Sequence, residues 1–514
     1  MGNASKKLAA KCTLLTKDEQ KYIASTFKAA SKNSDKIRED DLIKFWGPQM
    51  DPRLAQYLSN FLFGWGTNKS QIVEFNRFAE LYVYNVRGTV DERMMLTYNC
   101  LGKEFNENVE LPYQLVKEYC ESIASTFIKI LKASSSNRAK TWISKGFRGR
   151  PQHVQALGEA LAAAVGGDDE SPAHHVRSAQ VSKWLETDTL LMRLSELVFL
   201  TLYGINKRSG EPDSPPDSPC SSLSPMPKLL PVPDGLSSMP DYPAFIDLSH
   251  IVWLNNHLPQ KHQHKWRFLF SSHIHGESFS TMAGRIHDQG PSVLIIEDNS
   301  GYIFGGFAPH SWLIGPNFNG SEESFLFTLS PKMRMFQSSG FNNHYQYIHH
   351  HTKTMPNGLL MGGQLEFGGI WVNADPFGSG SSSESCSTYR GYKRLSKEPN
   401  FLIRSLEVWG VGDKPITVKE SLTSTTSRTS VLDTHKSERN FLNIIGKTQI
   451  SDGYLCSFFY FELYINFHKL FYTIFQDERD PSILDRNPEA KAMLEMAGRK
   501  QHSDGLREEN RNDT

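Results

Sequence analysis

The chain has 514 residues, enough for about three domains. Its 56 Lys and Arg balance 56 Asp and Glu, so bulk charge excludes a polyanion-binding role and we expect no nucleic-acid partner. The 39% hydrophobic content excludes wholesale disorder, and six scattered cysteines without C-x-x-C pairs give no disulfide or zinc framework.

The N-terminal residues 1–16 have features of a lipid anchor. Gly2 follows the first methionine and small residues come next, as N-myristoylation requires, but Lys6 stands where the motif usually has Ser or Thr. An ordinary N-terminus that happens to carry Gly2 is the alternative. One acyl chain anchors a protein only marginally, so nearby lysines or palmitoylation of Cys12 must supply a second signal.

Residues 17–208 are predicted to be helical, and a repeat runs through the first part. Three polar loops each carry one central aliphatic residue, Ile37, Val73 and Val109, at a spacing of 36 residues. Helix–loop–helix units with this period resemble EF-hands. Calcium needs a carboxylate at loop position one and a glutamate at position twelve, and none of the loops has both. We therefore expect an EF-hand-like scaffold without calcium, with a generic helical bundle as the alternative.

A flexible linker is predicted for residues 209–243, because residues 211–243 hold ten of the chain's 26 prolines and many serines. Residues 245–258 then have a helical pattern. The consecutive apolar residues of 292–297 predict a strand buried on both faces, and further short strands follow. We expect an α+β protein, with an all-α N-terminal half followed by an antiparallel β-sandwich with flanking helices.

Residues 244–412 contain an ordered series of motifs that resembles a TLDc domain. The motifs are 266–272 (WRFLFSS), 275–280 (HGESFS), 304–307 (FGGF), Trp312, Gly320, 324–327 (SFLF), 362–363 (GG), 368–371 (GGIW), 386–388 (CST) and 406–410 (LEVWG). With Gly2 and the helical half, the chain resembles the lysosomal, mTOR-associated members of that family. The resemblance implies a peripheral protein of the cytoplasm and the cytoplasmic face of the lysosomal membrane. It also implies a role in mTOR signalling and binding to the vacuolar proton ATPase.

The residues give little support for catalysis, and we expect neither a catalytic site, nor a cofactor, nor a bound metal. His273 and His275 alternate as two strand ligands would, but no third ligand accompanies them at a convincing spacing. Cys386 has no histidine nearby in sequence to activate it. The alternative is an oxidation-resistance protein with redox or metal chemistry in the TLDc-like region, which the family resemblance also suggests.

Glu366 lies in a glycine-rich loop, where a polar residue on exposed backbone can bind a partner. It could equally brace the loop through hydrogen bonds. We retain Glu366 as a candidate partner-binding residue.

The C-terminal part is predicted to be a connector followed by a helix. Residues 413–481 form the connector, in which the aromatic stretch 441–481 departs from the family pattern and is either a splicing artefact or a real insertion. Residues 482–500 predict an amphipathic helix, with Met493 and Leu494 in its apolar stripe. Such a helix either folds back on the TLDc-like region or docks on a partner, so both residues are candidate partner-binding residues.

Overall fold

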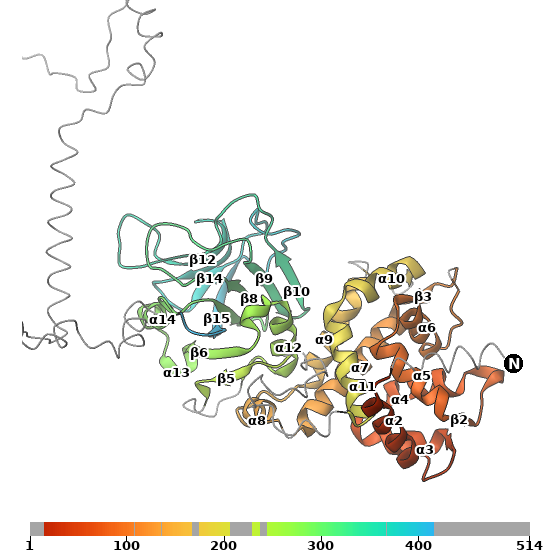
Figure 1. The fold of residues 1–514 in the computed structure, drawn as a ribbon. Helices are drawn as coiled ribbons and strands as arrows, with labels where there is room; N and C mark the ends of the chain where they lie inside the picture. Colours follow the sequence, from red (N-terminus) through yellow and green to blue (C-terminus); the bar gives the residue numbers. More distant parts are fainter. Residues whose placement is uncertain are drawn as a thin grey trace, which may run out of the picture. The chain divides into compact units, whose positions relative to one another are not determined.

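The computed structural model describes residues 15–106, 108–134, 136–166, 174–205, 229–236, 244–365 and 367–415 (Figure 1). Within these ranges the chain is α+β as predicted, with mainly helices up to residue 205 and mainly strands after residue 232. None of the described helices is both long enough and apolar enough to cross a membrane. Residues 1–14 of the predicted lipid anchor, almost all of the connector and the predicted C-terminal helix lie outside the described residues.

Helix α2 (Lys17–Ala30) begins at a cap that its own sequence supplies. Thr16 and Glu19 form a capping box, and Ile23 and Phe27 lie on the buried face. This confirms the three- and four-residue apolar spacing as helical. The other helices of this half are α3 (Glu39–Trp46), α4 (Pro52–Phe63), α5 (Phe75–Val86), α6 (Val90–Cys100), α7 (Tyr113–Ala133), α8 (Asn137–Ser144), α9 (Pro151–Gly166), α10 (Ser178–Thr187) and α11 (Thr189–Leu202).

Two of the predicted loops pair with each other. The short strands β1 (Lys36–Arg38) and β2 (Ile72–Glu74) are antiparallel, and Ile37 lies directly opposite Val73. Both side chains are buried. The prediction that these two aliphatic residues occupy equivalent loop positions is confirmed.

The third loop has a different register from the one predicted. Val109 precedes β3 (Leu111–Pro112), and the paired residue is Leu111, which lies opposite Val176 of β4 (His175–Val176). The 36-residue period therefore does not extend to the paired position of this loop. β4 belongs to a fourth loop, whose short strand the sequence pattern did not reveal.

An eleven-stranded sheet folds into two layers that share strand β15 (Asn400–Val411). β15 pairs with β7 along most of its length, with β6 near its C-terminal end and with β14 near its N-terminal end. The strand order β10–β9–β8–β7–β15–β14–β13–β12–β11 confirms the predicted sandwich, and only the β5–β6 pair is parallel. The strands are β5 (Val232–Asp234), β6 (Lys265–Ser271), β7 (Ser292–Asp298), β8 (Ile303–Ala308), β9 (Phe325–Ser330), β10 (Arg334–Gln337), β11 (Tyr347–His349), β12 (Gly358–Gln364), β13 (Phe367–Asn373) and β14 (Ser379–Ser381).

The two layers face each other at close range. A Cβ atom on Gly306 of β8 would lie 2.6 Å from the Met361 sulfur of β12, so a side chain at this position would force the layers apart. The helices α12 (Leu248–His257), α13 (Ser272–His275) and α14 (Phe279–Ile286) complete this part (Figure 1).

Part of the predicted flexible linker is ordered. β5 adds to the sheet beside β6, Leu230 and Leu236 are buried, and the indole Nε1 of Trp142 donates to the carbonyl of Pro231 at 3.0 Å. Composition predicted no core residues here because prolines and serines surround these leucines. The other residues of the linker lie outside the described ranges.

The helical half and the sheet share one hydrophobic core. The ring of Trp142 on α8 lies 5.4 Å from that of Trp409 on β15 and 6.2 Å from that of Trp266 on β6, measured between centroids. The described residues, from 15 to 415, accordingly belong to one compact unit.

Candidate functional site

Asp247 is the N-cap of helix α12, and its side chain is fully buried. Its Oδ1 accepts a hydrogen bond from the Ser249 amide at 3.0 Å. The Asp247 amide donates to Nδ1 of His250 at 3.3 Å. Asp is a preferred N-cap residue, so this D-x-x-H sequence is a capping box in which histidine takes the usual place of glutamate.

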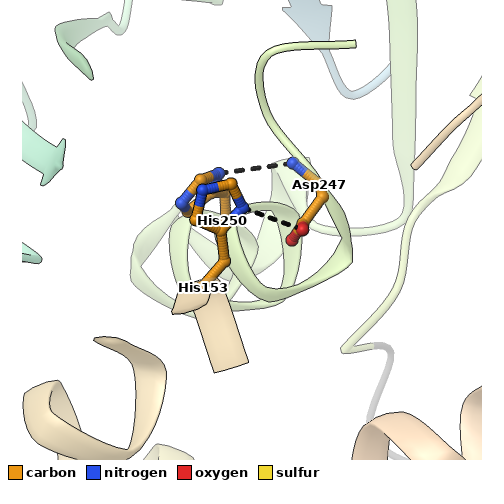
Figure 2. Close-up of side chains that lie close together, drawn as sticks. All are labelled: His153, Asp247 and His250. Carbon is orange, nitrogen blue, oxygen red and sulfur yellow. Dashed lines mark hydrogen bonds and ion pairs between the residues drawn. The ribbon is translucent and has the colours of Figure 1, made fainter. Parts of the chain in front are cut away.

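The other side of the site comes from the start of α9. Nδ1 of His153 donates to Oδ2 of Asp247 at 2.9 Å, and the Arg150 amide donates to the same oxygen at 2.7 Å. The rings of His153 and His250 are tilted by 39° with centroids 4.3 Å apart, and Figure 2 shows both rings beside the carboxylate. A buried carboxylate of the sheet-bearing part is therefore held by the helical half.

The surroundings fix the charges of this cluster. Burial raises the pKa of Asp247, but the hydrogen bonds from His153 and Arg150 more than offset it, and the pKa lies below its usual value. Burial lowers the pKa of His250 to about 3, so its ring is neutral at physiological pH. The cluster thus holds one ionised carboxylate.

One ligand atom from each of His153, Asp247 and His250 lies within 4.8 Å of the others, a set that imidazole-binding metals such as zinc use. The neighbours argue for a different role. Three N–H groups already donate to the carboxylate, the Arg150 guanidinium Nε lies 3.7 Å from Oδ2, and a helix N-terminus favours an anion over a cation. The arrangement therefore favours a structural role, in which the surrounding N–H groups hold the Asp247 carboxylate in place.

The residues predicted for lipidation and partner binding, Gly2, Glu366, Met493 and Leu494, all lie outside the described residues. Their roles remain predictions. The strands on either side of Glu366 are described, and β12 and β13 form an antiparallel hairpin there.

The same end of the sandwich presents exposed aromatic side chains. Phe341 is 85% exposed and Phe367 is 66% exposed. The loop of Phe341 is fixed to the hairpin, because the Gly363 amide donates to Oγ1 of Thr388 at 2.8 Å and that hydroxyl donates to Oδ1 of Asn342 at 2.9 Å. Exposed phenylalanines on a well-fixed backbone are typical of an interaction surface.

The residues of the redox or metal alternative have structural partners. Cys386 is buried, and burial raises its pKa, which disfavours a reactive thiolate. Nε2 of His273 lies 2.7 Å from Oγ of Ser405, whereas Nδ1 of His275 accepts from the Ser271 amide at 3.1 Å. Each of the two histidines thus makes its own hydrogen bond with a different serine.

In each of the first two loops, basic side chains occupy positions where calcium binding would need carboxylates. Asp41, at loop position twelve, contacts Lys32 Nζ at 2.8 Å and Arg38 Nε at 3.0 Å, and hydrogen bonds from both lower its pKa. At position twelve of the second loop, Arg77 donates to the Phe61 carbonyl at 2.8 Å. These contacts stabilise the loops without an added ion.

Sequence reasoning missed the histidine–aspartate cluster. The D-x-x-H pattern at the start of α12 is a local signal that could have found Asp247 and His250. His153 has no such signal, because it reaches Asp247 only through the packing of α9 on α12.

Comparison with known proteins agrees with this architecture. The TLDc domain family matches residues 239–412. The mTOR-associated protein MEAK7 of Xenopus laevis is 34% identical over 73% of this chain and 79% of its own length, and that of Homo sapiens is 27% identical over 99% of each. Nuclear receptor coactivator 7 of Mus musculus is 33% identical over 34% of this chain but only 18% of its own length. The chain therefore belongs to the mTOR-associated MEAK7 family of TLDc-domain proteins.

Proposed function

We propose that this protein is a non-enzymatic adaptor on the cytoplasmic face of the lysosomal membrane, which supports mTOR signalling and binds the vacuolar proton ATPase through its TLDc domain. The observation that carries the proposal is family membership, since relatives that match over most of this chain are named for their association with mTOR. Binding to the ATPase is what the TLDc resemblance implies. Myristate on Gly2 would supply the membrane contact.

The exposed end of the sandwich supports a binding role. Phe341 and Phe367 present apolar rings beside the hairpin that carries Glu366. Large exposed aromatic residues contribute much of the energy of protein interfaces. The helical half, in this proposal, is an EF-hand-like scaffold whose first two loops hold Lys32 and Arg77 in place of calcium.

Co-purification of the full chain with the vacuolar ATPase tests the proposal. Burial of Met493 and Leu494 against the partner would contribute about 1.5–3 kcal/mol each. Leu494→Glu places a charge in that contact, so affinity should fall at least tenfold, about 1.4 kcal/mol. Ala492→Glu, on the opposite side of the predicted helix, is the matched control and should bind normally.

Failure of the unmodified chain to co-purify with the ATPase would contradict the proposal as a whole. Normal binding by Leu494→Glu would contradict only the contribution of the C-terminal helix. Loss of binding on Phe341→Ser would place the contact at the exposed end of the sandwich, provided that Leu402→Ser binds normally. Leu402 is the matched control, because it is also exposed, at 59%, but lies on β15 opposite Ser379.

A further inference from the structure

A cavity of about 470 Å³ lies where the end of α5 meets the start of α6 and the α10–α11 junction. Its volume is in the range of small-molecule sites. Part of its wall is apolar and part is charged. Val86 and Met192 belong to the apolar part, and Asn85, Arg93 and Glu196 belong to the polar part.

Three polar groups of this cavity lack partners. Nδ2 of Asn85 donates to Oγ of Ser195 at 2.8 Å, which fixes the amide, and the remaining Oδ1 is buried with no hydrogen-bond partner among the described residues. Nε of Arg93 is likewise buried and unpaired there. Within the same described ranges, no hydrogen bond or ion pair reaches the carboxylate of Glu196. Such groups are normally satisfied by protein, water or a ligand.

Arg93 and Glu196 are each half-buried, and their surroundings disfavour the charged form of both side chains. Burial lowers the pKa of Arg93 and raises the pKa of Glu196, and each group feels the charge of the other without a direct contact. Perturbed groups that line one cavity are typical of functional sites. Two neighbours in the same wall are already satisfied, since Asp188 caps α11 and Arg193 donates to Asn256.

We propose that this cavity binds a small zwitterion, an α-amino acid with an apolar side chain. The ligand's carboxylate accepts hydrogen bonds from Arg93. Its ammonium group donates to Glu196 and to Oδ1 of Asn85, and its side chain packs against the apolar wall near Val86 and Met192. Charge-assisted hydrogen bonds of this kind are stronger than neutral ones, and only a ligand with both charges pairs with both of these half-buried side chains.

Calorimetry and thermal unfolding of the full chain with L-leucine and L-methionine test the inference. Both should bind and raise the melting temperature. Leucinamide, which lacks the carboxylate, and 4-methylpentanoate, which lacks the ammonium group, should bind at least tenfold more weakly. Arg93→Gln and Glu196→Gln should each weaken leucine at least tenfold. Arg138→Gln is the matched control, because Nε of Arg138 is also buried and unpaired but lies outside the cavity wall.

The possible results separate clearly. No binding of either amino acid at millimolar concentration overturns the inference. Equal affinity for leucine and leucinamide, or an unchanged affinity in Arg93→Gln, overturns it too, because charge pairing would then not be the cause. If a cavity variant fails to fold by circular dichroism, the two leucine analogues decide the question on the unmodified chain.

Discussion

Removal of the Trp142 side chain should weaken the contact between the helical half and the TLDc domain. The ring is fully buried between Trp266 and Trp409, and its Nε1 donates to the Pro231 carbonyl. Truncation of a buried Trp to Ala costs about 3–5 kcal/mol, because contacts are lost and a cavity remains. The unpaired Pro231 carbonyl adds roughly 1–3 kcal/mol. We expect Trp142→Ala to lower the free energy of unfolding by at least ~4 kcal/mol.

Guanidinium unfolding of the full chain, followed by near- and far-ultraviolet circular dichroism, measures this loss. Trp142→Phe is the matched control, since it keeps an aromatic ring against Trp409 and loses the bond to Pro231, at a cost of about 1–3 kcal/mol. We also expect the described unit to unfold in one transition in the unmodified chain and in two transitions in Trp142→Ala. A loss below ~1 kcal/mol in Trp142→Ala, or equal losses in both variants, would refute the reasoning.

Three further outcomes are expected. Gly2→Ala should move the protein from the lysosomal to the soluble fraction, and intact-mass data without an acyl group would contradict the proposed anchor. Calcium should give no calorimetric heat on the full chain, because Lys32 already contacts the first loop's carboxylate; saturable binding there would contradict this. The pKa of His250 is lowered to about 3 in the folded state, so stability is complete above pH 6.5 and falls by about 1.4 kcal/mol per pH unit below it, as the unfolded chain takes up the proton. His250→Gln should flatten that slope, and an unchanged slope would assign it to other groups.

Local pattern predicted the elements whose own residues determine which face is buried. The apolar run of 292–297 predicts β7, and the structure buries that strand on both faces. The pattern of 245–258 predicts α12, which begins three residues later because Asp247 is its N-cap. β5 could not be predicted in this way, because it is stabilised by pairing with β6 rather than by its own composition.

The candidate site depended even more on tertiary packing. Asp247 and His250 are close because they cap one helix, but His153 and Arg150 meet them only where α9 packs on α12. The 36-residue repeat predicted the paired residues of the first two loops, up to Val73, but not the paired residue of the third loop. At the third loop the chain pairs through Leu111, two residues beyond the predicted position, because the partner strand β4 sets the register there.

The TLDc region of this chain is not a self-sufficient packing unit. Two donors to the buried Asp247 carboxylate, from His153 and Arg150, belong to the helical half, and the removal of each leaves a cost of about 1–3 kcal/mol. Trp409 would lose its cover from Trp142, and the edge of β6 would lose β5, which precedes the family match. A TLDc fragment that begins at residue 244 would therefore have an altered fold, and its binding could not be compared with that of the full chain. Since the two halves share one core, binding assays should use the full chain rather than either half.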